Sequence, residues 1–183
     1  MQAAGSTDRV IENYFSGFAG SAASAIIHYP EQSKTTFHIE RIEILDQNGD
    51  LKQKIYTWDA VRFRIVFHSP RAVKIGSVVF QISTTSGSRL LLASTEPDQS
   101  VPISFREGNN IVDCFIPQLM LTAGKYQLGA SLAIPNIEYL CEGLDHALIE
   151  VEAKDVFNSG LSPNSTRSLI PMDCRWQIVK AGV

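Results

Sequence analysis

The stretch EGNNIVDCFIPQLMLTAGKYQLGASLAI, residues 107–134, predicts a strand, a bend and a second strand. Its first half, IVDCFI at 111–116, alternates between two rows of side chains with the two-residue period of a β-strand. Pro117 ends that strand, and Ala123-Gly124 supplies the permissive backbone of the bend. In the second half, one row is apolar, namely Tyr126, Leu128, Ala130, Leu132 and Ile134. The other row is small and uncharged, namely Gln127, Gly129, Ser131 and Ala133.

Length and composition indicate one domain with a single sizeable core, since the chain has 183 residues, of which 44% are hydrophobic. A net charge of -3 and a pI near 5.8 lack the basic bias of a nucleic-acid surface, so we predict no nucleic-acid partner. The sequence shows neither a signal peptide nor an apolar run long enough to span a bilayer. Three widely spaced cysteines without a CxxC motif predict buried thiols in a reducing compartment, with a metal site or a disulfide as the minor alternative. These features favour a cytoplasmic location.

The first 35 residues differ in composition from the rest. DRVIENYF at 8–15 predicts two turns of amphipathic helix, and the Gly-, Ala- and Ser-rich stretch 16–35 predicts a linker with few contacts. We therefore interpret residues 1–35 as the end of a preceding domain and a linker, and residues 36–183 as a β-domain.

Short alternating segments fill the β-domain at intervals of roughly ten residues. We predict strands at 37–46, 61–68, 77–84, 89–95, 111–116, 126–134, 146–152 and 174–179, with a connecting arm at 54–58. About eight short strands with almost no helix predict an all-β, antiparallel β-sandwich of immunoglobulin or jelly-roll kind. In immunoglobulin order, 37–46, 61–68, 111–116 and 89–95 form one sheet, and 77–84, 126–134 and 146–152 form the other.

Catalytic motifs are missing from the sequence. We find no phosphate loop, GxGxxG, HExxH or GxSxG, and the four histidines are scattered singly. Four acidic residues, Asp113, Glu138, Glu142 and Asp145, could converge as a glycosidase pair, although their spacing is also that of solvated loop charges. We therefore predict no enzyme, no cofactor and no metal.

The predicted outer faces of the two sheets contrast in charge. The first carries Arg41, Glu43, Arg62, Arg64, His68 and Asp113, as a solvated surface does. The second carries short amides and hydroxyls, which suit a neutral polyhydroxylated ligand because they donate and accept hydrogen bonds without crowding it. The alternative interpretation is a face covered by a second subunit or by the C-terminal strand. Aromatic residues that could stack on sugars include Tyr139, although such residues are also common in cores.

Four segments in this order resemble the C-terminal domain of Wzt, the ATP-binding subunit of ABC transporters that export O-antigen polysaccharide. They are ERIEILDQNGD, VVFQISTTSGSRLLLAST, FREGNNIVDCFIPQLMLTAGKYQLGASLA and DHALIEVEAKDVFNSG, within residues 37–160. DRVIENYF resembles the closing helix of the nucleotide-binding domain in such subunits. The sequence departs from the family at Thr57-Trp-Asp-Ala60, where a Gly-Glu turn is common.

This resemblance implies an immunoglobulin-like sandwich that binds the exported glycan in the cytoplasm, often at its modified non-reducing end, and pairs as a homodimer. It also implies that the full-length protein, itself an ATPase, joins a membrane-spanning transporter subunit and so lies at the inner membrane.

No family ligand set transfers residue by residue, so the candidate site rests on strand alternation and on nearby aromatic and histidine side chains. The carbohydrate-binding candidates are Ser77, Gln81, Ser83, Gln127, Ser131, Tyr139 and His146. The predicted function is non-catalytic recognition of the polysaccharide end. Its alternative is a structural module that only holds two transporter subunits together.

Overall fold

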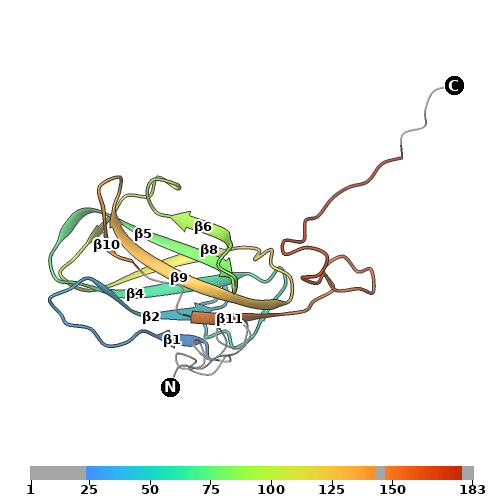
Figure 1. The fold of residues 1–183 in the computed structure, drawn as a ribbon, viewed down its shortest axis with the longest axis horizontal. Coiled ribbons are helices and arrows are strands. Elements are labelled where there is room, and N and C mark those ends of the chain that lie inside the picture. Colours follow the sequence, from blue (N-terminus) through green and yellow to red (C-terminus); the bar gives the residue numbers. More distant parts are fainter. Residues whose placement is uncertain (1–23, 143–146, 179–183) are drawn as a thin grey trace, which may run out of the picture.

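Two β-sheets packed face to face make up the computed structural model, which describes residues 24–142 and 147–178 (Figure 1). Within these residues the chain forms strands, turns and loops but no helix. The strands are β1 (Ile26–His28), β2 (His38–Leu45), β3 (Ile55–Tyr56), β4 (Val61–Ser69), β5 (Val73–Thr84), β6 (Arg89–Ser94), β7 (Ile103–Phe105), β8 (Gly108–Ile116), β9 (Gly124–Ile134), β10 (Glu138–Cys141) and β11 (Ala147–Glu152). The predicted all-β sandwich is confirmed.

The smaller sheet has four antiparallel strands in the order β1-β2-β4-β8 (Figure 1). Its register pairs His38 with His68 and Arg64 with Asp113. The apolar residues of VRFRIVFH at 61–68 alternate with polar ones, so β4 turns one row of side chains towards the core. Val61, Phe63 and Ile65 in that row are completely buried.

The larger sheet has the order β3-β11-β9-β5-β6, with β10 added to β9 and β7 added to β5. All of its pairs are antiparallel except β3 with β11, which are parallel. β5 and β9 form its centre over eight paired residues, from Ser77 with Ala133 to Thr84 with Tyr126.

The core lies between the two sheets. The apolar row of β9, namely Tyr126, Leu128, Ala130 and Leu132, is at most 2% exposed, as its alternation predicts. The rings of Phe63 on β4 and Phe80 on β5 lie 4.7 Å apart and join the two sheets at the centre. The stretch 107–134 thus contributes one strand to each sheet, β8 to the smaller and β9 to the larger.

Two predicted strand positions are wrong. Residues 89–95 are expected in the smaller sheet, but β6 pairs with β5 in the larger one, because the tight turn at 84–88 folds it back on its neighbour. Gly87 takes a positive φ of 90° in this turn. The predicted last strand, 174–179, has no strand in its described part, 174–178, where the Trp176 side chain is 94% exposed.

The sandwich also includes residues that the sequence pattern assigns to a linker. β1 pairs with β2, from Ile26 with Glu43 to His28 with Arg41, and the preceding Ala25 is buried. The predicted helix at 8–15 lies outside the described residues. No helix in the described part of the chain has the length and apolar character needed to cross a bilayer.

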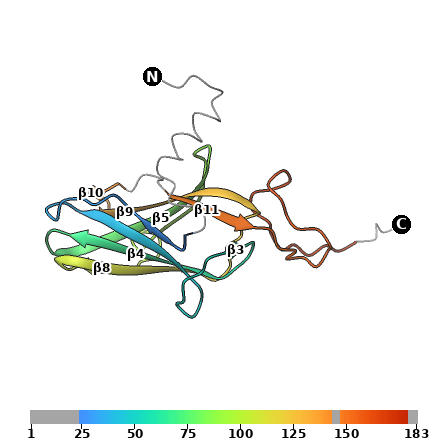
Figure 2. The same cartoon turned by 90° about the horizontal axis from the view of Figure 1, so that it is seen from below.

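The segment after β11 returns to the body of the domain before the chain leaves it. The indole Nε1 of Trp58 donates a hydrogen bond to the carbonyl of Pro171, at 3.2 Å. The backbone N–H of Thr122 donates to the carbonyl of Leu169, at 3.1 Å. Beyond Pro171 the chain runs away from the sandwich (Figures 1 and 2).

Candidate functional site

The outer face of the larger sheet brings together most of the predicted carbohydrate-binding residues. Ser83 lies opposite Gln127 in the register, and Gln81 lies opposite Gly129. Ser131 lies opposite Val79, one pair further along the same two strands. The predicted row is therefore one continuous patch across β5 and β9.

This patch is unevenly accessible. Ser77, Ser83 and Gln127 are only 1%, 2% and 5% exposed. The Ser77 hydroxyl donates a hydrogen bond to the carbonyl of Glu96, at 2.7 Å, so this hydroxyl is already bound by the loop after β6. These three side chains belong to the outward row but are covered, so they do not offer their polar groups to solvent.

Gln81, Ser131 and Tyr139 remain accessible. Gln81 and Ser131 are half-buried, and Tyr139 on β10 is 58% exposed. Tyr139 pairs with Ala133, two residues from Ser131 along β9. His146, the seventh predicted residue, lies outside the described residues.

Apolar side chains border the accessible part of this patch. Leu92 on β6 lies directly opposite Gln81 and is 47% exposed. An amide, a hydroxyl and a phenol beside aliphatic carbon match the two surfaces of a sugar ring, because its hydroxyls need hydrogen-bond partners and its C–H face needs an apolar contact. We name this surface, made of Gln81, Leu92, Ser131 and Tyr139, the outer patch.

The outer face of the smaller sheet is charged and internally paired. Arg64 Nε donates to Asp113 Oδ1 at 2.8 Å, and Arg62 Nη1 donates to Asp113 Oδ2 at 3.1 Å. The Arg64 hydrogen bond is the largest of the contributions that lower the pKa of Asp113, and the same bond raises the pKa of Arg64. Because both carboxylate oxygens of Asp113 accept hydrogen bonds from these arginines, this carboxylate offers little to a ligand.

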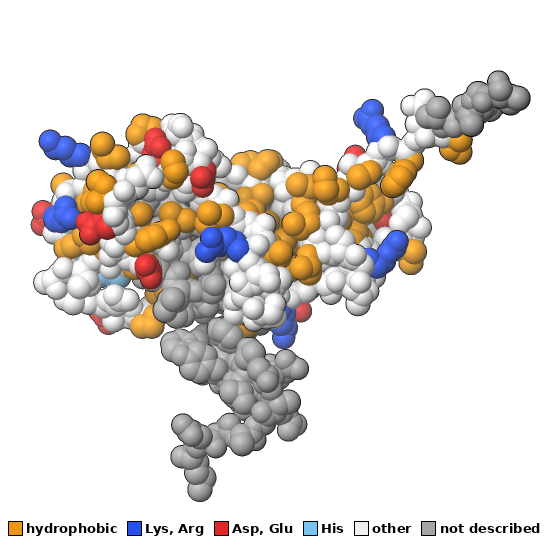
Figure 3. All heavy atoms as spheres, turned by 45° about the horizontal axis from the view of Figure 1, so that its top comes forward, with side chains coloured by type: hydrophobic (Ala, Val, Ile, Leu, Met, Phe, Trp, Pro, Cys, Tyr) orange, Lys and Arg blue, Asp and Glu red, His pale blue; other side chains and the backbone are white. Residues whose placement is uncertain are grey.

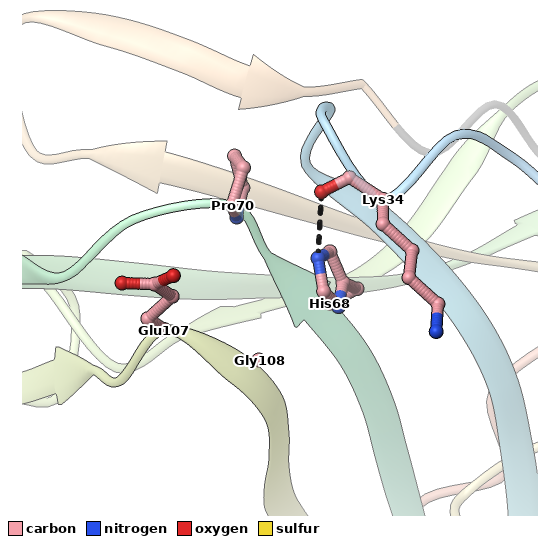
Figure 4. Close-up of a pocket in the computed structure, with 5 residues that line it drawn as sticks. All are labelled: Lys34, His68, Pro70, Glu107 and Gly108. Atoms are coloured by element: carbon pink, nitrogen blue, oxygen red, sulfur yellow. Dashed lines mark hydrogen bonds between the residues drawn. The ribbon is translucent and has the colours of Figure 1, made fainter.

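The end of this face is hollowed beside residues 28–34 (Figure 4). One cavity of about 450 Å³ lies among Lys34, His68, Pro70, Glu107 and Gly108. A second, of about 280 Å³, lies between the 28–34 segment and β2. Both are lined by Lys34 and His68, so they adjoin, and we name them together the end cleft.

Two histidines hold the wall of the end cleft in place. His68 Nε2 donates to the carbonyl of Lys34 at 2.9 Å, and its Nδ1 lies 3.3 Å from Oδ1 of Asn109. The His38 ring stacks on the His68 ring, with centroids 5.2 Å apart. No sequence signal points to this cleft, because one wall comes from residues predicted as a linker and the histidines are 30 residues apart.

Groups suited to catalysis do not gather in the described residues. Asp113 lies on β8 of the smaller sheet and is held by two arginines, whereas Glu138 lies on β10 of the larger sheet.

Burial raises the pKa of the Cys114 thiol to about 11, so it stays protonated at neutral pH. Cys141 is half-buried and Cys174 is exposed, so the prediction of buried thiols does not hold for Cys174. Within the described ranges no three His, Cys, Asp or Glu side chains are grouped as metal ligands.

Comparisons with known proteins agree on one domain type. A family model described as the Wzt C-terminal domain matches residues 31–161. A solved structure, described as the crystal structure of the C-terminal domain of wzt, aligns with a TM-score of 0.64 and 14% sequence identity. The alignment covers 83% of this chain and 91% of that chain, and at this identity it shows the shared fold alone. A search of curated proteins finds no match.

Proposed function

The chain belongs to the family of Wzt C-terminal domains, which are domains of O-antigen transporter subunits, and we propose that it binds the exported O-antigen polysaccharide without catalysing a reaction. The outer patch is the observation that supports this function. It offers an amide, a hydroxyl and a phenol beside aliphatic carbon, and none of its four members is charged. A neutral sugar can replace water on such a surface without separating ion pairs.

The proposed ligand contacts are Gln81, Ser131 and Tyr139, with Leu92 against the C–H face of a sugar ring. Ser77, Ser83 and Gln127 are covered on the same face, so we do not place them among the ligand contacts. The recognised part of the polysaccharide is its non-reducing end, where a terminal modification marks a finished chain.

The proposed location is the cytoplasmic side of the inner membrane. There the full-length subunit would join the membrane-spanning transporter subunit, and the sandwich would present the outer patch to the polysaccharide before export. Hydrolysis of ATP would belong to the rest of the full-length subunit.

Isothermal titration with O-polysaccharide tests this function. The polysaccharide is released by mild acid hydrolysis from the lipopolysaccharide of the strain that encodes the chain. We expect the wild-type domain to bind it and Gln81→Ala to bind about fivefold more weakly, because one net hydrogen bond contributes about 1 kcal/mol. Lys74→Ala, which changes an exposed side chain elsewhere on β5, is the matched control and should bind as the wild type does. Equal affinity of all three proteins would remove the outer patch from the proposal.

Self-association is a second candidate function, and the C-terminal tail favours it. Met172, Trp176 and Ile178 are 65%, 94% and 95% exposed, and water-exposed apolar groups of this size are typical of interaction surfaces. Hydrophobic side chains also lie along the C-terminal segment in the space-filling view (Figure 3). A second copy of the chain is the proposed partner, which would make the domain a homodimer.

Light scattering coupled to size-exclusion chromatography separates the two functions. Removal of residues 172–183 should convert a dimer into a monomer if the tail joins two copies. Gln81→Ala should weaken polysaccharide binding and leave the dimer intact if the outer patch recognises the glycan. A Gln81→Ala protein that is monomeric would instead support a domain that serves assembly.

A further inference from the structure

We infer that the end cleft is a second carbohydrate-contacting site, on the opposite sheet from the outer patch, and that it binds a neutral, hydroxyl-rich sugar unit. This inference rests on the proposed function, because it assigns a further part of the same polysaccharide to a further surface. A polysaccharide can reach both surfaces because it is a chain of many sugar units.

The size of the end cleft fits one or a few sugar rings. Its two adjoining parts measure about 450 and 280 Å³, and small-ligand sites in proteins typically measure roughly 300–1,000 Å³. Pro70 supplies an apolar surface at one side, between His68 and Glu107 (Figure 4). Such a surface suits the C–H face of a pyranose.

The charged groups of the end cleft are available to a ligand. Lys34 and Glu107 make no ion pair in the part of the chain that the structure describes. Their charged ends point away from each other on either side of His68 (Figure 4). An ammonium group donates hydrogen bonds and a carboxylate accepts them, so each can bind a sugar hydroxyl at its own end of the cleft.

The balance of charge argues for a neutral ligand. Two cations, Lys34 and Arg41, and three carboxylates, Glu31, Glu40 and Glu107, line the cleft. Arg41 Nε already donates to Glu43 Oε1 at 2.7 Å and its Nη1 lies 3.8 Å from Glu40 Oε2, which leaves Lys34 against Glu31 and Glu107. An anionic group would therefore meet more negative than positive charge, whereas a neutral polyol can use carboxylates and ammonium alike.

His68 is a positioning residue for this site. Its bond to the Lys34 carbonyl holds the 28–34 segment over the sheet and so keeps Lys34 at the edge of the cleft. The stacked His38, which is 6% exposed, lies opposite His68 in the register and restrains the ring from the neighbouring strand β2. A sugar in the cleft would touch both the sheet and the connection between β1 and β2.

The test compares a double variant of the cleft with a matched double variant elsewhere, in titrations with the same O-polysaccharide. Lys34→Ala with Glu107→Gln should weaken binding at least about tenfold, because hydrogen bonds to charged groups contribute more than neutral ones. Lys74→Ala with Asp50→Asn changes the same two charge types at exposed positions outside the cleft and should bind normally. Hydrogen exchange on the wild type gives a second readout, and the amides of residues 29–36 should gain protection when polysaccharide is added.

The outcomes separate the two proposals. Normal binding by the cleft variant, without protection of residues 29–36, would overturn the end cleft and leave the proposed function intact. Loss of binding in the cleft variant, with Gln81→Ala unaffected, would support the end cleft and overturn the outer patch. A wild-type domain that binds no O-polysaccharide would overturn both.

Discussion

The outer faces of the two sheets follow the same alternation of side chains, yet they differ in what that alternation exposes. On the smaller sheet, Arg62, Arg64 and Asp113 point outward, and both arginines donate hydrogen bonds to Asp113. On the larger sheet, Ser83 and Gln127 also point outward but are 2% and 5% exposed. The two-residue period of a strand therefore predicts the face of the sheet on which a side chain lies. Whether that side chain is exposed to solvent depends on the segments that cover the face.

The largest expected effect on stability comes from comparing an inward-facing residue of β5 with its outward-facing neighbour. Phe80→Ala should lower the free energy of unfolding by about 3–5 kcal/mol, because it empties the contact with Phe63 that joins the sheets. Gln81→Ala, one residue further along on the outer side, should cost less than about 1 kcal/mol. Urea unfolding of both variants measures this contrast, and similar losses would mean that the two residues share one environment.

A smaller effect concerns the end of the larger sheet, where β7 folds onto β5. A Cβ at Gly76 would come within 2.5 Å of the Phe105 ring, which is 2% exposed and lies against Phe67, with centroids 4.9 Å apart. Gly76→Ala should therefore lower the free energy of unfolding by about 1–3 kcal/mol through overpacking.

Thermal unfolding checks this prediction with Gly87→Ala as the comparison. Position 87 has open space around it but a positive φ, so its cost should be backbone strain without a clash. Adding Phe105→Leu to each variant should recover stability only in the Gly76→Ala protein, and recovery in neither would contradict the proposed clash.

The smallest effect belongs to the charged face. Asp113→Asn should lower the free energy of unfolding by about 0.5 kcal/mol at pH 7, since surface ion pairs contribute little. The folded-state pKa of Asp113 lies below its ordinary value of 3.8, so its contribution is present above that pH and is lost as the pH falls through the lower value. Urea titrations at several pH values should show the difference between variant and wild type shrinking at acid pH. Asp50→Asn at an exposed turn is the control. If the stability difference between Asp113→Asn and the wild type grew at acid pH, it would contradict a lowered pKa of Asp113 in the folded state.

Much of the sandwich could be predicted because its strands carry strong local signals. The rows of β4, β5 and β9 alternate clearly, and the turn at 84–88 is marked by Ser86-Gly87. β6 belongs to the larger sheet because it pairs with β5, and the sequence of residues 89–95 does not indicate that partner. β1 is three residues long in a Gly- and Ser-rich context, so no local pattern predicts its pairing with β2.

The candidate site was predictable only in part. Alternation correctly grouped Gln81, Ser83, Gln127 and Ser131 on one face. Their burial depends on segments distant in sequence, such as the loop whose Glu96 carbonyl accepts the Ser77 hydroxyl. The end cleft depends on a contact between Lys34, in the connection from β1 to β2, and His68 on β4, and no spacing rule connects those residues.

Chemical-shift mapping of the isotope-labelled wild-type domain during titration with O-polysaccharide tests the central claim most directly. We predict saturable changes at the amides of Gln81, Leu92, Ser131 and Tyr139, and at those of Lys34 and Glu107 in the end cleft. An unrelated neutral polysaccharide should leave these signals in place. A spectrum that does not change at any concentration of O-polysaccharide would contradict carbohydrate recognition by this domain.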